Sequence, residues 1–320
     1  MDSRKARFGL MTLAIALLLT FTGSGVRFAA GQESGTAPSP TATGARVIML
    51  GTGTPMPDPE RSGPSVAVVV GNASYIVDCG PGVVRRAAAA AYRHRIPALL
   101  ANNLKVLFVT HLHTDHTVGY PDIIFTPAVV HRDAPLEVYG PPGLKAMTDH
   151  ILEAYKEDID IRINGLEHGN PAGYVVNVHE IQPGVIYKDS NVTVKAFAVK
   201  HGAWKYAYGY RFETPGRTIV ISGDTSPAQS VVDNCDGCDL LFHEVYCQEG
   251  YKSLGPEKKK YFTEYHTSTV ELGEIAAKAR PRELVLYHQI PWECPENQLI
   301  TEVNSVFNGK VVSAHDLDIF

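Results

Sequence analysis

Four side chains of types that bind metal ions lie within six positions of one another: His111, His113, Asp115 and His116. His111 and His113 are two residues apart, so in an extended chain they point to the same side and can hold one ion. Asp115 and His116 follow as the chain turns toward a helix, and they can reach a second ion. Imidazole and carboxylate groups are ligands that zinc-type ions prefer. Because burying four such groups is costly without a role, a metal site is a better interpretation than a polar, histidine-rich loop.

The surrounding pattern predicts where further ligands come from. The apolar run 104–109 leads into the cluster and is typical of a buried strand. Alternating strands and helices indicate a layered α/β fold, whose sites lie at the carboxyl ends of strands. A single histidine at a strand end is more often packed than ligating, but several from separate strands favour one shared site. The later strands and the residues at their ends are 192–199 with His201, 217–221 with Asp224, 239–242 with His243 and Glu244, and 283–286 with His288.

Two other segments carry open interpretations. Residues 65–70 and 73–77 predict a hairpin that ends at Asp78, just before a helix predicted to open at Pro81. Asp78 could cap that helix or could hydrogen-bond a ligand histidine, and the sequence leaves both open. Residues 158–190 are less regular, and we expect them to form an insertion that faces the substrate.

Composition limits the classes of function. The chain has 320 residues, 44% of them apolar, and a net charge of −5, which allows one large domain or two small ones. Its one basic run, residues 258–260, is typical of a solvated surface. The sequence therefore predicts no extended nucleic-acid surface.

The first residues predict export. Residues 1–31 combine a basic start, a twelve-residue apolar stretch (10–21) and a small-residue cleavage site, as a secretory signal peptide does. An uncleaved anchor is the alternative, although the stretch is short for a membrane span. Residues 32–45 are rich in Ser, Thr, Pro and Gly and predict a flexible linker. We expect a periplasmic or secreted protein with no stable membrane span after cleavage.

Five cysteines fit an oxidising compartment but leave at least one unpaired within a single chain. Cys235 and Cys238 have redox-motif spacing without the strand–motif–helix context of a thioredoxin-like site. A structural disulfide or two inert thiols is the better interpretation, and no second close pair completes a zinc site.

These motifs together resemble the metallo-β-lactamase superfamily over about residues 46–320, which we take as one domain. The resemblance implies a four-layer αββα sandwich and two Zn²⁺ ions, although Mn²⁺ or iron could take the same ligands. It implies that His111, His113 and His201 bind one ion, that Asp115, His116 and His288 bind the other, and that Asp224 bridges both. A hydroxide shared by the ions would attack the ester, with Asp115 also serving as base.

The turn 51–55 with Arg61, the His243-Glu244 pair and His266-Thr267-Ser268-Thr269 resemble the ribonuclease Z and arylsulfatase-like branch. That likeness implies that His243, or its partner His266, protonates the leaving group and that Glu244 orients one of them. A packed, hydrogen-bonded histidine is the alternative for His243 and for His266.

Two departures argue against a tRNA precursor as substrate. Only residues 202–223 separate His201 from Asp224, where ribonuclease Z usually carries a long arm, and a secretion signal does not suit tRNA processing. The favoured function is an exported hydrolase of small phosphodiesters. The same site could instead serve aryl sulfates. A non-catalytic zinc-binding export protein is the alternative of another class, although it would have little use for the extra histidines. Oligomeric state stays open, with a homodimer among the options.

Overall fold

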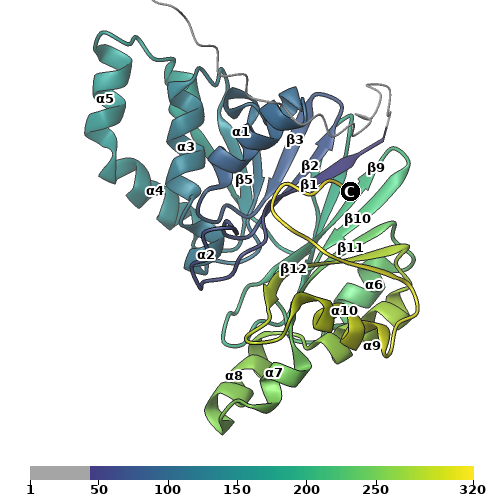
Figure 1. Cartoon of the computed structure of the whole chain (residues 1–320). Helices are drawn as coiled ribbons and strands as arrows, with labels where there is room; N and C mark the ends of the chain where they lie inside the picture. The colour runs from purple at the N-terminus through teal and green to yellow at the C-terminus, as the bar shows by residue number, and fades with distance from the viewer. Residues whose placement is uncertain (1–43) are drawn as a thin grey trace, which may run out of the picture. The chain divides into compact units, whose positions relative to one another are not determined.

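The computed structural model describes residues 44–320, so the predicted signal peptide and nearly all of the predicted linker lie outside the described residues. The first of two sheets has the strand order β1-β2-β3-β4-β5-β6 (Figure 1). Neighbours from β1 to β3 are antiparallel, and those from β3 to β6 are parallel. The strands are β1 Arg46–Gly51, β2 Ser65–Val70, β3 Ala73–Val77, β4 Val106–Phe108, β5 Leu136–Gly140 and β6 Val176–Glu180.

The second sheet repeats this scheme in the order β13-β12-β11-β10-β9-β8-β7. Neighbours from β7 to β10 are antiparallel, and those from β10 to β13 are parallel. The strands are β7 Gly184–Lys188, β8 Thr193–Ala198, β9 Tyr208–Thr214, β10 Arg217–Ile221, β11 Leu240–Tyr246, β12 Glu283–Ile290 and β13 Lys310–Ser313.

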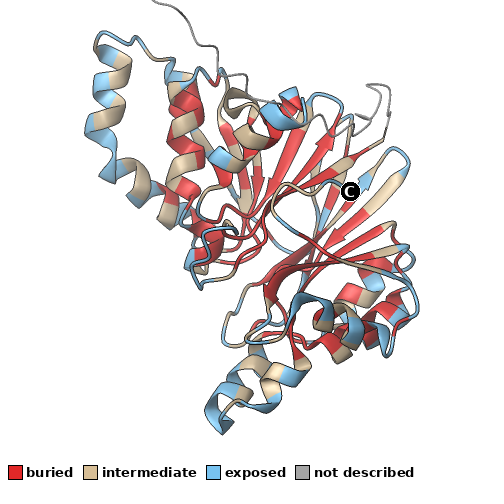
Figure 2. Cartoon of the chain, in the orientation of Figure 1, coloured by how far each residue is buried: buried red, intermediate tan, exposed pale blue. Residues whose placement is uncertain are grey.

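Helices cover the outer face of each sheet (Figure 1). The first sheet carries α1 Val83–Arg93, α2 Thr114–Thr117, α3 Tyr120–Val129, α4 Leu144–Ala154 and α5 Lys156–Asn164, with short 3₁₀ turns η1 Pro97–Leu99, η2 Ala101–Asn103 and η3 Pro171–Tyr174. The second sheet carries α6 Gln229–Cys235, α9 Thr269–Ala279 and α10 Glu296–Asn304, while α7 Gln248–Lys252 and α8 Pro256–Tyr265 extend from its end. Neither α5 nor α8 buries a residue, and both are mostly tan and pale blue in Figure 2.

Strand periodicity explains the layers. In β2, Val66 and Val68 pack between the sheets, whereas Ala67 and Val69 pack against the outer helices of the first sheet. Such alternation places successive side chains on opposite faces. A third apolar cluster lies between the second sheet and α6, α9 and α10. The predicted four-layer αββα sandwich is therefore confirmed.

The local predictions mostly hold, with two strand ends misplaced. The hairpin of β2 and β3 has the predicted bounds. β11 and β12 run past the predicted ends, so His243, Glu244 and His288 lie inside strands. Between the two strands, Tyr287 and His288 oppose the single residue Glu244, which makes a β-bulge, and His288 has a φ of 47°. Such a bulge re-aims a side chain without ending the strand, which the sequence pattern could not reveal.

The helix α3 continues through Pro127 to Val129. Proline lacks an N–H, so the carbonyl of Ile123 loses its helical donor. The fully buried Arg132 replaces that donor, with Nη1 2.9 Å from Ile123 O, and its Nη2 donates to the carbonyls of Ile124 and Gly173. Burial lowers the pKa of Arg132 to about 10, which leaves it charged at neutral pH. Within residues 44–320, no helix has the length and apolarity of a membrane span.

Candidate metal centre

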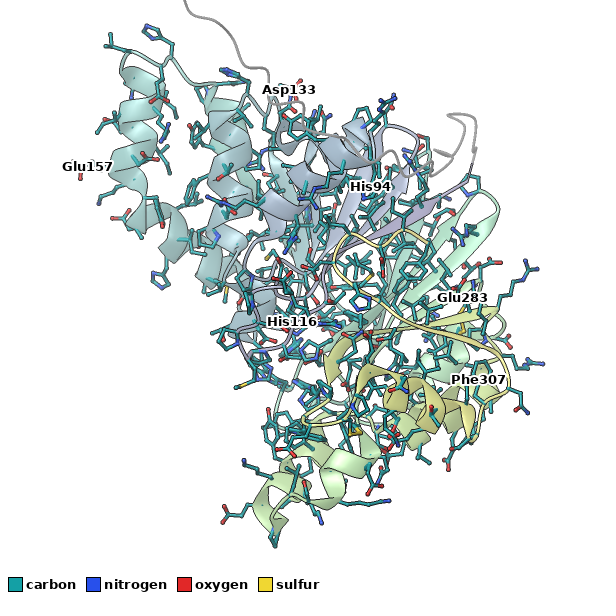
Figure 3. All side chains as sticks on the ribbon, viewed as in Figure 1. His94, His116, Asp133, Glu157, Glu283 and Phe307 are labelled. Atoms are coloured by element: carbon teal, nitrogen blue, oxygen red, sulfur yellow. A yellow bond between two sulfur atoms is a disulfide. The ribbon has the colours of Figure 1, made fainter. Side chains whose placement is uncertain are left out.

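The seven side chains predicted as metal ligands come together where the two sheets end. They form two groups in which the ligand atoms lie within 4.8 Å of one another. The groups are His111, His113, His201 and Asp224, and Asp115, His116 and His288. His116, which lies in α2, is labelled in Figure 3. Their roles as ligands stay a prediction, but their convergence is a property of the fold.

In the first group, three ring nitrogens face one another. His113 Nδ1 lies 2.9 Å from His111 Nε2 and 3.1 Å from His201 Nε2. Burial lowers the pKa of His111 well below its usual range and that of His201 to about 4, so both rings are neutral at pH 7. Neutral imidazole is the form that binds a metal ion.

The second group contacts Asp224, the carboxylate of the first group. His288 Nε2 lies 3.2 Å from Asp115 Oδ2 and 3.5 Å from Asp224 Oδ2. The other oxygen of Asp224, Oδ1, lies 3.4 Å from His116 Nε2, and Asp224 Oδ2 lies 4.0 Å from His201 Nε2. Asp224 therefore touches both groups. Burial opposes ionisation of Asp224, but His288 and His116 outweigh it and hold its pKa well below the usual range.

Asp78 supports both groups from behind. Its Oδ2 accepts hydrogen bonds from His116 Nδ1 at 2.8 Å and from the hydroxyl of Thr110 at 2.9 Å. Thr110 Oγ1 in turn lies 3.0 Å from His111 Nδ1. Both rings are thus held with Nε2 toward the centre. The helix α1 begins after Gly82 without a side-chain cap, so Asp78 is the partner of a predicted ligand rather than a helix cap.

The end of α8 fixes His201. Its Nδ1 donates to the carbonyl of Tyr265 at 2.7 Å, which leaves Nε2 for the centre. Gly202 makes this contact sterically feasible, because a Cβ at that position would lie 2.0 Å from the Tyr265 ring. His113 differs: Trp204 Nε1 donates to its Nε2 at 2.7 Å.

The donor set fits divalent metal ions. His116 Nε2 and Asp224 Oδ1 are buried, face each other and have no hydrogen-bond partner among residues 44–320. Buried polar atoms without partners are costly, and an ion between them would supply the missing contact. Imidazole nitrogens and carboxylate oxygens in two adjoining groups suit a pair of ions.

The structure separates the two histidines predicted to protonate a leaving group. His266 Nδ1 lies 3.3 Å from Glu244 Oε2, whereas His243 Nδ1 contacts the backbone carbonyl of Glu244 at 2.7 Å. Only His266 lines the pocket described below, and His243 is fully buried. Burial lowers the pKa of each ring to about 4 and raises the pKa of Glu244 well above its usual range. The geometry thus favours His266 over His243 and gives Glu244 the orienting contact.

A pocket of about 980 Å³ opens directly onto the centre. Its walls come from residues 53–59, the inner face of α8 and the segment 288–296. No residue between 158 and 190 lines it, so the expectation that this insertion faces the substrate is wrong. That segment instead forms α5, η3, β6 and part of β7.

Residues 74–289 match the Beta-lactamase superfamily domain. The chain belongs to this superfamily. It is 32% identical over 277 residues to ribonuclease Z of Mycobacterium bovis, covering 85% of this chain and 96% of that protein. It is 33% identical over 276 residues to ribonuclease Z of Mycobacterium marinum, with the same coverage. The chain therefore lies in the ribonuclease Z branch and is a metal-dependent hydrolase.

Solved structures share the fold. The metallo-beta-lactamase fold protein YhfI from Bacillus subtilis superposes with a TM-score of 0.65 at 21% identity, covering 86% of this chain and 98% of that one. The short form of human tRNase Z gives a TM-score of 0.62 at 24% identity with the same coverage.

Sequence patterns missed three contributors to the site. Trp204 and Tyr265 contact predicted ligands, but nothing in their spacing marks them. Asp316 lies near the end of the chain and accepts hydrogen bonds from Thr52 N and Ser62 N at 2.9 and 2.7 Å, which shapes the loop in front of the pocket. Arg61 in that loop donates to Gln289, the neighbour of His288, at 2.8 Å.

Proposed function

We propose that this chain is an exported dinuclear zinc hydrolase that cleaves small phosphodiesters. The observation that carries the proposal is Asp224 at the floor of an open pocket, where Oδ1 faces His116 of one ligand group and Oδ2 faces His201 of the other. A carboxylate in that position suits two ions rather than one. Divalent ions at such a site lower the pKa of bound water and polarise the oxygens of a phosphoryl group.

The protein's own groups have separate tasks. Asp115 lines the pocket beside His288, where its carboxylate can accept a proton from the attacking water. His266 lies on the pocket wall with Nδ1 toward Glu244, which leaves Nε2 to give a proton to the departing oxygen. Glu244 is held in turn by the N–H of Thr267 at 2.9 Å. Burial raises the pKa of Glu244 and lowers that of His266, which favours the uncharged form of both groups and suits a pair that passes a proton to the departing oxygen.

Several features favour a small ester over RNA. The hairpin of β9 and β10 fills residues 208–221, with no room for a long arm. Apart from the predicted ligands and His266, the pocket is lined by two acidic and two basic side chains, so their net charge is zero. They are Asp58, Glu296, Arg61 and Lys258. A polyanion would be drawn by a strongly basic wall instead. The relatives named ribonuclease Z support phosphodiester chemistry as the shared element.

Two disulfides support export. Cys235 pairs with Cys238 and Cys247 with Cys294, while Cys79 is free and buried. Disulfides persist in oxidising compartments. Sequencing the amino terminus of the mature protein from the culture or periplasm tests the proposed cleavage after residue 31, and a retained leader would contradict it.

The catalytic proposal is tested with zinc-loaded protein and four chromogenic substrates: bis(4-nitrophenyl) phosphate, 4-nitrophenyl sulfate, a lactone and a cephalosporin. We expect turnover of the phosphodiester above the others. His266→Ala should retain its metal and lose about 10²- to 10⁴-fold in kcat for esters with poor leaving groups, because a positioned proton donor contributes about that much. The loss in kcat should be smaller for nitrophenyl esters, because nitrophenolate leaves without needing a proton.

His179→Ala is the matched control. His179 also contacts a carboxylate, Glu137, at 2.8 Å, but on the exposed edge of the first sheet. It should keep the parent kcat. A phosphodiester with an alkyl leaving group that His266→Ala cleaves at the parent rate would refute the role of His266, and no phosphodiester turnover by the metal-loaded parent would refute the function.

A further inference from the structure

Aromatic side chains continue outward from the metal centre along one side of the pocket. The His266 ring lies 6.0 Å from that of His288 and 5.6 Å from that of Phe262, and the Phe262 ring lies 4.8 Å from that of Trp292. These are ordinary spacings for interacting aromatic rings. We call Tyr261, Phe262 and Trp292 the aromatic wall; all three line the pocket.

The aromatic wall is only partly covered by other parts of residues 44–320. Tyr261 is 43% exposed, and Phe262 and Trp292 are half-buried. The loop 53–59 also lines the pocket and contributes three prolines and Met56, a residue that is 76% exposed. Large exposed apolar groups gathered around one open pocket mark a binding site rather than ordinary surface.

The charges beside the aromatic wall are too few for a polyanion. Arg61 is already engaged, with Nη2 3.8 Å from Glu296 Oε1 and Nη1 bonded to Gln289. Lys258 is the other cation of the lining, and it lies one helical turn before Tyr261 and Phe262 on the same face of α8. The pocket thus combines one anion-binding end at the centre with an apolar body.

The aromatic wall is held in place by its own connections. Phe262 and His266 are four residues apart, so they lie on one face at the end of α8. Trp292 lies in the segment that the Cys247–Cys294 disulfide ties to the start of α7. A preformed wall lowers the entropy cost of binding a rigid ligand.

We propose that the aromatic wall binds a flat, apolar group on the leaving-group side of the ester, so that the natural substrate is an aryl or similarly planar phosphodiester. The leaving-group side follows from His266, whose ring contacts Phe262 of the aromatic wall and whose proposed role is to protonate the departing oxygen. The inference rests on the proposed function for its chemistry, but the aryl preference is a binding property that can be measured without turnover.

Phosphonates allow binding to be measured without hydrolysis, because their C–P bond is not an ester bond and a phosphodiesterase does not cleave it. Phenylphosphonate and methylphosphonate carry the same anionic group and differ in the ring. Burying an aromatic side chain of this size is worth about 1.5–3 kcal/mol, so we expect phenylphosphonate to bind about 10- to 100-fold more tightly to the zinc-loaded protein. Isothermal titration calorimetry measures both dissociation constants.

Phe262→Leu and Trp292→Leu test the wall itself. Each substitution should reduce the phenyl-to-methyl ratio, which is the affinity for phenylphosphonate divided by that for methylphosphonate, at least threefold. The affinity for methylphosphonate should not change. Tyr92→Leu is the control, since Tyr92 is 76% exposed on α1, away from the pocket, and its ratio should equal the parent's. Metal content and the urea midpoint of each variant identify one that has not folded, and Phe262, on an exposed helix, is the safer of the two positions.

A parent ratio within twofold, no binding of either phosphonate, or an unchanged ratio in both folded variants would each overturn the aromatic subsite. Aryl preference without phosphodiester turnover would support the subsite and refute the proposed function. Phosphodiester turnover without aryl preference would support the proposed function and refute the subsite.

Discussion

Replacing Asp78 by Asn tests how the metal centre is supported. Asp78 has a φ of 61°, a left-handed conformation that Asn adopts readily, so the backbone should tolerate the change. The carboxylate accepts from Thr110 N at 2.8 Å through Oδ1, and from the Thr110 hydroxyl and His116 Nδ1 through Oδ2. If the side-chain amide of Asp78→Asn keeps its oxygen toward Thr110 N, its NH₂ group takes the place of Oδ2 and points at His116 Nδ1–H. Two donors then face each other inside the protein.

The expected effect is large enough to measure. An unsatisfied buried donor costs about 1–3 kcal/mol, and loss of a hydrogen-bond partner behind a metal ligand weakens metal affinity about 10- to 100-fold. Because Asp78 bonds His116 directly and His111 through Thr110, the ion predicted at His116 should weaken more than the ion predicted at His111.

Competition with a chromophoric zinc chelator at pH 7.5 measures both affinities. Asp189→Asn is the matched control, because Asp189 also accepts several hydrogen bonds, among them Tyr187 Oη at 3.0 Å and Asn191 N at 2.7 Å, but is not part of either ligand group. Asp189→Asn should keep parent affinities. Zinc affinities in folded Asp78→Asn within twofold of the parent at both sites would show that Asp78 does not support the predicted ligands.

Three further predictions concern other parts of the molecule. His243 has a buried-state pKa of about 4 against about 6.5 when unfolded, so the unfolded chain binds more protons between these values and stability falls as pH drops through that window. In metal-free protein, the free energy of unfolding measured with urea should vary less with pH in His243→Gln than in the parent, by up to about 1.4 kcal/mol per pH unit. The same pH dependence in both proteins would contradict the low pKa of His243. Arg132→Met strands buried carbonyls, including that of Ile123 beside Pro127, and should lower the free energy of unfolding by about 3 kcal/mol or more; a loss under 1 kcal/mol would be inconsistent with this. A metal ion on His113 Nδ1 would leave the ring proton on Nε2, which could then no longer accept the Trp204 N–H. Zinc should therefore change the tryptophan emission of the parent but not that of Trp204→Phe. Equal changes in both proteins would disprove this link between Trp204 and the metal.

Much of the site was predictable because its predicted ligands obey local rules. His111 and His113 follow a buried strand, and Asp115 and His116 follow in the next turn, so spacing alone placed four candidates together. Apolar strands with polar ends similarly marked His201 and Asp224. The layered fold then required these ends to meet.

What escaped prediction depends on contacts between distant segments. The bulge that aims His288 is set by pairing between β11 and β12, and no residue type marks it. The choice between His243 and His266 depends on which ring lines the pocket, which the end of α8 decides. The substrate-facing role expected of residues 158–190 failed because α8 and the loop 53–59, not the insertion, enclose the centre.

The proposed function requires that Asp224 join two divalent ions beside the substrate pocket. Metal content per chain tests this, measured by plasma mass spectrometry on protein that has been stripped with chelator, reloaded with zinc and desalted. We expect two zinc ions per parent chain and fewer than two in folded Asp224→Ala. A parent chain that retains no zinc, or an Asp224→Ala variant that still holds two ions with parent affinity, would contradict this expectation.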